Sequence, residues 1–349
     1  MLRHLLLGSL LGGTSGFAQQ PLVVTTNTIL RDLTEQLTGG AVRVVSLVPS
    51  GTASVEYEPT DDDVALMNEA RLVVANGAGY EPWLKDLEKK STYDGLVVVT
   101  TDGIPLYDVD GELHEIDASG PTKSAVFAVA VEFDPYAWLD PLNAVLYIEH
   151  IRNGLADFMD GTTKTAMDER ATALIKEVRD LHFYAEKQFA AIPVSQRVLV
   201  TPHDSLRYFA AAYDFRIVPI TGLASGQELR PAIETRLIET IRNLHQPAVF
   251  FERTANVRET RRLNMATGVK MVTSLYTTDV GSTGTKASTY VGMMRSNVDA
   301  IVDALRDTNA PTAAPATTAP ATKVADPKAP AAKAPAASTA QPAAPAVAR

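Results

Sequence analysis

Two series of short apolar runs alternate with helical patterns along this chain, and a long helical pattern separates the two series. The runs are rich in Val and Leu, which is typical of strands buried in a mostly parallel sheet. The first series predicts strands at 22–26, 42–48, 72–75 and 96–100, with helices at 27–38, 60–69 and 80–90. After a further helix at 141–159, the second series predicts strands at 197–201, 216–220, 248–252 and 270–273 and a final helix at 288–306. This alternation indicates an α/β layer structure.

The stretch 164–190 contains neither Pro nor Gly and places apolar side chains three or four residues apart. This spacing predicts one long amphipathic helix between the two series. The interpretation is an α/β fold of two lobes with mostly parallel sheets, joined by a single long rigid helix. A helix that belongs wholly to one lobe is the alternative. The expected boundaries are 19–160 for the N-terminal lobe, 161–192 for the linker helix and 193–309 for the C-terminal lobe.

Residues 1–18 have the features of a secretory signal peptide, with cleavage expected after Ala18: a basic start, a short apolar middle and small residues before a break. A buried N-terminal helix is the alternative. The apolar run is too short to span a bilayer, and the chain has no Cys to carry a lipid anchor of the bacterial lipoprotein kind. A soluble protein exported to the periplasm is therefore expected.

Residues 310–349 hold 8 of the 21 prolines, 18 alanines and no aromatic residue. Such a segment lacks the apolar side chains that offset the entropy of ordering, so a disordered Ala/Pro-rich tail is expected. It would serve as a solvated spacer or, alternatively, as a polymer-binding arm.

The body of the chain is acidic, since residues 19–309 carry 27 basic and 40 acidic residues. This charge disfavours nucleic acid and anionic membranes as partners and attracts cations. The absence of Cys excludes thiolate zinc sites, iron–sulfur clusters and cysteine nucleophiles. Any metal site must use nitrogen or oxygen ligands.

Several motifs occur in order along residues 22–306: Val24-Thr25-Thr26, Leu47-Val48-Pro49-Ser50-Gly51, Tyr57-Glu58-Pro59-Thr60, Ala75-Asn76-Gly77-Ala78-Gly79-Tyr80-Glu81-Pro82-Trp83-Leu84, Asp134-Pro135-Tyr136-Ala137-Trp138, Thr201-Pro202-His203-Asp204-Ser205, and Leu275-Tyr276 leading to Asp279. In these motifs the chain resembles the solute-binding receptors of zinc and manganese ABC importers, also called cluster A-I. The resemblance implies two α/β lobes joined by a rigid helix, with one metal ion bound in the cleft and handed to a membrane permease.

In this family four positions supply the metal ligands, and the resemblance places them at Val55, Tyr136, His203 and Asp279. Only His203 and Asp279 carry over as they stand. Valine has no lone pair to offer, and tyrosine ligates only as a phenolate, although its reference pKa is about 10. Outside a metal site, His203 would be a cap or core residue and Asp279 a loop cap.

Neighbouring residues offer replacements for the two missing histidines. Glu56 lies one position after the valine, but successive side chains of an extended segment face opposite ways. It therefore reaches the cleft only if this loop is not a regular strand. Glu58 is expected to be structural, and Asp204 is a weaker candidate. The predicted metal ligands are His203, Asp279, Tyr136 and Glu56.

Such an oxygen-rich ligand set favours manganese or iron over zinc. The segment 106–132 also carries several acidic residues but a single histidine, His114. A solvated acidic loop is therefore expected there, with metal collection as the alternative.

The sequence thus predicts an exported, monomeric receptor that captures a divalent transition metal, zinc or manganese with iron as a third candidate, and delivers it to an ABC permease. A degenerate receptor-fold protein, acting as a scaffold or adhesion module with weak or no metal binding, is the alternative. An enzyme is not expected. His203-Asp204-Ser205 holds the residue types of a catalytic triad, but adjacency in sequence does not give triad geometry. No Gly-x-Ser-x-Gly motif or Gly-rich phosphate loop is present.

Overall fold

The first half of the chain builds a four-stranded parallel sheet. The computed structural model describes residues 20–115, 133–201, 204–219, 231–244, 247–253 and 257–306, apart from the side chains of residues 55, 244 and 257. The strands are β1 (Leu22–Thr25), β2 (Arg43–Ser46), β3 (Leu72–Ala75) and β4 (Leu96–Val99), in the order β2-β1-β3-β4. Every residue of the central strands β1 and β3 is buried, which is why these strands are apolar on both faces.

Three helices of this half begin where the sequence supplies a capping side chain. α1 (Thr28–Thr38) is capped by Asn27, whose side chain accepts a hydrogen bond from the backbone of Leu30. α2 (Asp61–Glu69) begins with a reciprocal capping box between Thr60 and Asp63, and α4 (Pro141–Ala156) is capped by Asp140 with proline at its first position. The structure thus places these starts within one residue of the predicted ones.

One helix differs from its prediction. α3 spans Leu84–Lys90, whereas the sequence predicted a helix over 80–90. The preceding segment is a turn in which residues 77, 78 and 79 all have positive φ, and the carboxylate of Glu81 accepts hydrogen bonds from the backbone of Asn76 and Gly77. The helix starts only after this turn is complete.

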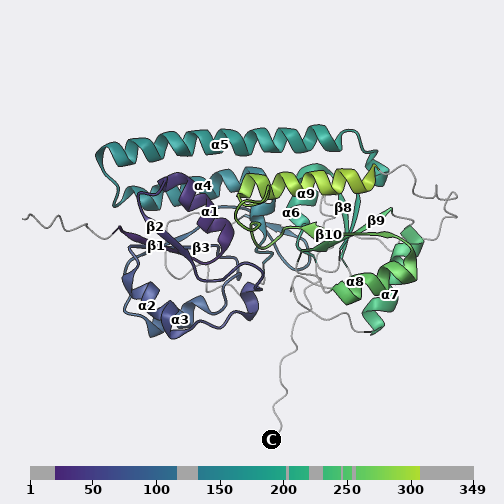
Figure 1. The fold of residues 1–349 in the computed structure, drawn as a ribbon, viewed down its shortest axis with the longest axis horizontal. Coiled ribbons are helices and arrows are strands. Elements are labelled where there is room, and N and C mark those ends of the chain that lie inside the picture. Colours follow the sequence, from purple (N-terminus) through teal and green to yellow (C-terminus); the bar gives the residue numbers. More distant parts are fainter. Residues whose placement is uncertain are drawn as a thin grey trace, which may run out of the picture. The chain divides into compact units, whose positions relative to one another are not determined.

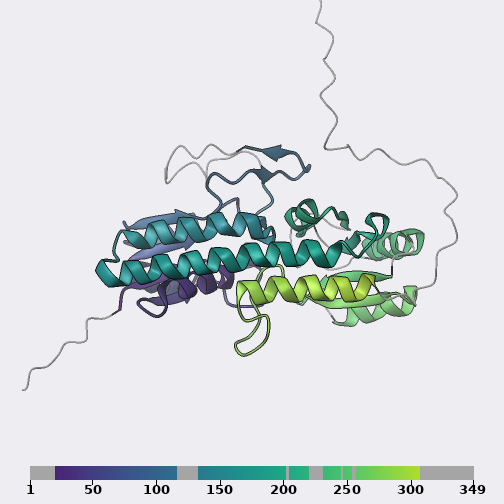
Figure 2. The ribbon, with the colours of Figure 1, turned by 90° about the horizontal axis from the view of Figure 1, so that it is seen from above.

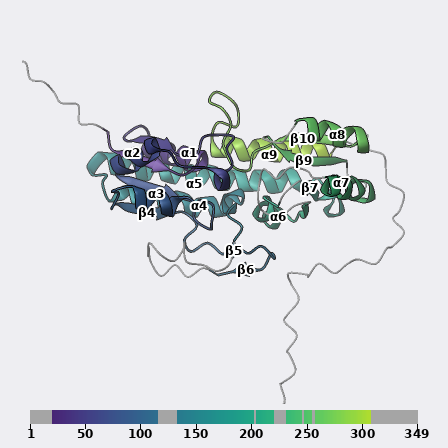
Figure 3. The ribbon, with the colours of Figure 1, turned by 90° about the horizontal axis from the view of Figure 1, so that it is seen from below.

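The second half contains two further parallel strand pairs. β7 (Val198–Thr201) pairs with β8 (Arg216–Pro219), β9 (Ala248–Glu252) pairs with β10 (Lys270–Leu275), and β7 also contacts β9. The accompanying helices are α6 (Arg207–Tyr213), α7 (Pro231–Leu244), α8 (Val257–Thr267) and α9 (Tyr290–Leu305). The short antiparallel strands β5 (Leu106–Tyr107) and β6 (Leu113–His114) form a separate hairpin (Figure 3). The prediction of an α/β fold with mostly parallel sheets is confirmed.

The long helix α5 (Gly161–Phe189) packs against α1 and α4 of the first half and against α6 and α9 of the second (Figures 1 and 2). The apolar residues that predicted this helix form its buried stripe: Met167, Ala171, Leu174, Val178 and Leu181. Toward the first half, Arg170 donates hydrogen bonds to the carbonyl oxygens of Leu37 and Thr38, at 2.8 and 2.9 Å, and so satisfies the C-terminal end of α1. α5 therefore contacts the helices of both halves, while the domain boundaries at 160 and 192 stay predictions.

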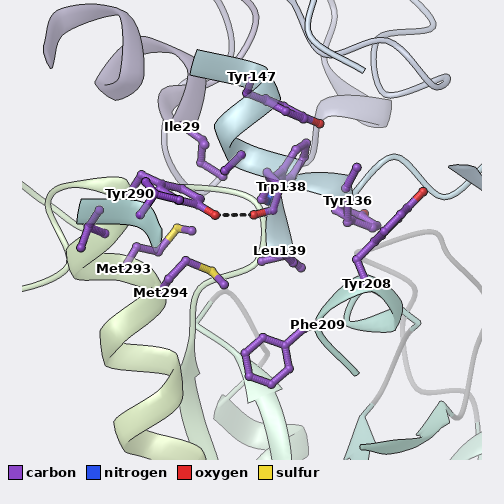
Figure 4. Packing of buried hydrophobic residues seen from close by; sticks show 14 of the residues in the cluster. Ile29, Tyr136, Trp138, Leu139, Tyr147, Tyr208, Phe209, Tyr290, Met293 and Met294 are labelled. Atoms are coloured by element: carbon purple, nitrogen blue, oxygen red, sulfur yellow. Dashed lines mark hydrogen bonds between the residues drawn. The ribbon is translucent and has the colours of Figure 1, made fainter. Parts of the chain in front are cut away.

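A buried tryptophan joins the two halves near their sheets (Figure 4). Trp138 is fully buried, its indole N–H donates to the Thr277 carbonyl oxygen at 2.9 Å, and its own carbonyl accepts from the Tyr290 hydroxyl at 2.7 Å. Nearby, the Asp32 carboxylate of α1 accepts from the Tyr290 backbone N–H at 2.6 Å, at the first residue of α9. First-half residues therefore hold both the loop before Asp279 and the start of α9.

The predicted signal peptide and tail lie outside the described residues. Within the described ranges, no helix is both long and apolar enough to cross a membrane.

Gly154 tests the packing of α4 on the sheet. A methyl group at this buried position would overlap with Val98 of β4, so Gly154→Ala should lower the free energy of unfolding by about 1–3 kcal/mol through overpacking. This loss opposes the gain of about 1 kcal/mol that alanine normally brings to a helix interior. Urea denaturation measures the change. The exposed neighbour Asn153 provides the control, since Asn153→Ala should stay within about 0.5 kcal/mol of the parent; a stabilised Gly154→Ala protein would contradict this packing.

Candidate metal-binding site

Asp279 lies where the loop after β10 meets the first half of the chain. It is 5% exposed, and its Oδ2 atom accepts three hydrogen bonds. The donors are the Ser50 hydroxyl at 2.5 Å, the Gly51 backbone N–H at 2.9 Å and the Arg253 guanidinium at 2.6 Å. Gly51 has φ +84°, a conformation that favours glycine. The predicted ligand Asp279 is thus a buried carboxylate that joins residues of both halves.

The backbone on either side of Asp279 is fixed by first-half residues. Two residues before it, the Thr277 carbonyl accepts from the Trp138 indole. One residue after it, the Val280 backbone N–H donates to the Thr28 hydroxyl at 3.2 Å. The position of the carboxylate therefore depends on contacts between the halves rather than on the loop alone.

Tyr136, the second predicted ligand, precedes a short 3-10 helix (Ala137–Leu139) and is buried, with 4% of its surface exposed. Its backbone N–H donates to the Asp134 carboxylate at 2.9 Å. Its ring packs edge-on against Tyr80, with centroids 6.3 Å apart. It also packs edge-on against Trp138, with centroids 5.6 Å apart (Figure 4). The side chain therefore belongs to an aromatic cluster that reaches the contact between the halves.

Tyr80 shows which charges gather around this cluster. Its hydroxyl is fully buried, and burial raises its pKa well above the ordinary value of 10. The charges of Tyr136, Glu81, Asp279 and Glu252 raise the pKa further. Acidic side chains of both halves thus act on this hydroxyl, which gives the region a negative character.

Glu252 is a residue that the sequence analysis did not single out. It ends β9, and its carboxylate accepts hydrogen bonds from Ser205 at 3.2 Å and, very closely, from Thr277. Its position at the carboxyl end of a parallel strand, where α/β proteins place their ligands, was the available signal. Glu252 adds a second carboxylate beside the Asp279 loop.

The segment predicted to replace the missing first-half ligand is not a strand. Residues 54–56 form a 3-10 turn, held by the Trp83 indole, which donates to the Ser54 carbonyl at 2.8 Å. The Ser54 hydroxyl in turn donates to the Tyr80 carbonyl at 2.7 Å. The Glu56 side chain is exposed, so it is not held against the buried carboxylate of Asp279.

His203 lies outside the described residues, together with Pro202; the described chain ends at Thr201 and resumes at Asp204. Asp204 forms a close ion pair with Arg207 three residues later, so its carboxylate has a structural partner. Asp108 in the acidic segment accepts from His114 at 2.7 Å and from two backbone N–H groups, which makes it a cap of the β5–β6 turn. Across the described part of the chain, no three His, Asp or Glu side chains come together as a metal-binding group.

A buried carboxylate supports the turn that carries Tyr80. Glu81 is 3% exposed and accepts hydrogen bonds from the Thr26 hydroxyl at 2.5 Å and from the backbone of Asn76 and Gly77 at 2.8 and 3.0 Å. Burial raises the pKa of Glu81 from 4.5 to about 7, although these hydrogen bonds oppose the shift. Glu81 thus ties the end of β3 to the aromatic cluster.

The raised pKa of Glu81 predicts a pH dependence of stability. The folded protein keeps a proton on Glu81 that the unfolded chain releases above pH 4.5. The contribution of Glu81 to the free energy of unfolding is therefore full below this pH and is lost as the pH rises through about 7. Glu81→Gln cannot titrate, so the unfolding free energy of the parent minus that of this variant should fall across this window. Denaturation at several pH values measures the difference. The exposed Glu169→Gln should give a flat difference; a flat curve for Glu81→Gln as well would contradict the shift.

Comparison with known proteins shows similarity to components of metal uptake. The family model described as "Zinc-uptake complex component A periplasmic" matches residues 23–304. The chain is 32% identical over 295 residues to the manganese-binding lipoprotein MntA of Halalkalibacterium halodurans, covering 84% of this chain and 91% of MntA. It is 28% identical to the zinc-binding protein TroA of Treponema pallidum, covering 86% of this chain and 96% of TroA.

Solved structures agree with the fold. The periplasmic zinc-binding protein TroA from Treponema pallidum superposes with a TM-score of 0.70 at 27% identity and covers 82% of this chain and 99% of its own. A periplasmic metal-binding protein from Candidatus Liberibacter asiaticus gives a TM-score of 0.67 at 22% identity, with coverage of 82% and 99%, a likeness that concerns the fold alone.

Proposed function

The chain belongs to the family of periplasmic zinc-uptake components, and from this premise we propose that it is a receptor that captures a divalent transition metal and delivers it to the permease of an ABC importer. The family is one of transport receptors rather than enzymes. Its relatives carry names that state zinc or manganese binding. These relatives favour the receptor over the scaffold or adhesion module that the sequence left open.

The observation that carries the proposal is the position of Asp279. A carboxylate from the second half, 5% exposed, is held against the Ser50–Gly51 loop of the first half. Glu252 accepts from Thr277 in the same loop, and the rings of Tyr80 and Tyr136 pack against each other on the first-half side. Capture of a hard cation between two lobes requires oxygen donors from both of them. Such donors lie around the Asp279 carboxylate.

For the ligands we propose His203 and Asp279 from the second half, with Tyr136 and Glu56 from the first. Glu56 needs its turn to rearrange, because its side chain is exposed. Tyr136 needs the cation itself to lower the pKa of its hydroxyl, since a neutral phenol is a poor ligand. One chain supplies all four side chains, so the receptor acts as a monomer.

Replacement of Asp279 tests the site directly. Asp279→Asn keeps an oxygen that accepts from Ser50 and Gly51 but removes the charge, so the Kd for metal should rise roughly hundredfold. Titration of the purified protein with zinc, manganese and ferric salts measures the affinity. Asp303 on α9 is exposed and provides the matched control, because Asp303→Asn should bind like the parent. Equal affinity of the Asp279 and Asp303 variants would contradict the proposed site.

Tyr136 tests the metal preference. Tyr136→His introduces the nitrogen donor that zinc favours and should raise the affinity for zinc relative to manganese by about tenfold or more. Tyr136→Phe removes only the hydroxyl and should weaken binding of both metals while leaving the aromatic packing in place. Competition between zinc and manganese for each variant gives the ratio. If the parent already binds zinc most tightly, the proposed preference for manganese or iron is wrong.

A further inference from the structure

Asp279 has a positive partner within the protein itself. Arg253 lies in the turn directly after β9, and its Nη2 atom is 2.6 Å from Asp279 Oδ2 and 3.3 Å from the Ser50 hydroxyl. Its guanidinium carbon lies 5.4 Å from the centre of the Tyr276 ring, within cation–π range. Arg253 belongs to none of the sequence motifs described above.

The two partners of this ion pair differ in how firmly they are held. The Asp279 side chain is 7% exposed, and hydrogen bonds to Trp138 and Thr28 fix its backbone on both sides. The Arg253 side chain is 36% exposed. The guanidinium can therefore leave the carboxylate and enter solvent without opening the core, whereas the carboxylate cannot follow it.

A metal ion and the guanidinium compete for the negative charge of this carboxylate. Zinc binds a carboxylate oxygen at about 2.0–2.2 Å, and Arg253 Nη2 lies 2.6 Å from Oδ2. A metal ion on the same carboxylate is therefore close to the guanidinium, and like charges this close in a partly buried site repel. Because arginine stays protonated at any physiological pH, it cannot relieve the repulsion by losing a proton. It can do so only by moving outward into solvent.

We propose that Arg253 is a resident counter-ion of Asp279, which the incoming metal ion must displace and which returns when the metal leaves. Arg253 thereby lowers the affinity for metal and favours its release to the permease. The inference rests on the proposed receptor function with Asp279 as a ligand. Displacement also breaks the contact between Arg253 and Ser50, so it changes how the Ser50–Gly51 loop of the first half is held.

The test compares Arg253→Gln with Arg262→Gln. Arg262 pairs with Glu234 away from Asp279 and controls for the loss of one positive charge from the second half. The Kd for manganese and for zinc is measured by competition with a chromogenic chelator, and the dissociation rate constant by stopped flow. Arg253→Gln should lower the Kd roughly tenfold, mainly through slower dissociation, while Arg262→Gln should leave both unchanged. Arg253→Lys, which keeps the charge, should stay closer to the parent.

A second arm assigns the effect to Asp279. In an Asp279→Asn background, Arg253→Gln should no longer raise the affinity, since the carboxylate for which the two cations compete is gone. An equal gain in both backgrounds would show that Arg253 acts through overall charge and would overturn the inference. The inference would also be overturned if the parent bound metal as tightly as the Arg253→Gln variant. The proposed receptor function would still stand in that case. If neither protein binds any of the metals, the proposed function fails and the inference falls with it.

Discussion

The hydrogen bond from the Trp138 indole to the Thr277 carbonyl is the interaction on which the site depends. It joins a fully buried side chain of the first half to the loop of the second half that carries Asp279. The same residue accepts from Tyr290 at the start of α9, so one indole and its backbone position both the loop and the helix that follows it. A buried donor without its partner costs about 1–3 kcal/mol, which favours a single arrangement of the two halves.

Carboxylates in this protein fall into two physical groups. Burial raises the pKa of Asp32 to about 6, of Glu81 to about 7 and of Asp134 to about 8, and all three accept hydrogen bonds from backbone N–H groups. They hold turns and helix ends in place. Asp279 also accepts a backbone hydrogen bond, but its counter-charge is an arginine on the surface. A carboxylate whose counter-charge can move away is suited to binding a metal ion. A buried carboxylate held by backbone hydrogen bonds is suited to supporting a turn or a helix end.

The sequence predicted the strands and α5 well because the physics behind them is local. Runs that are apolar on both faces indicate parallel strands, and a stripe such as Met167, Ala171 and Leu174 indicates one helix face. The start of α3 was wrong because the Glu81 carboxylate closes a turn there, which periodicity does not reveal. For the site, the resemblance named Asp279, but its partners Ser50 and Gly51 are 229 and 228 residues distant in sequence. Contacts at such separations leave no pattern in either segment. Arg253 and Glu252 contact residues only 26 and 25 positions away, but they belong to no motif of the resemblance, and only the place of Glu252 at the end of a strand pointed to it.

The chain contains two tryptophans, and both are bound to loops that concern the ligand. The indole of Trp83 holds the Ser54 carbonyl beside Glu56, and that of Trp138 holds the Thr277 carbonyl beside Asp279. Indole emission responds to the loss of a hydrogen bond and to the entry of water. The protein therefore contains an intrinsic optical reporter on each side of the proposed binding region, and replacing Trp83 with phenylalanine would let the Trp138 signal be read alone.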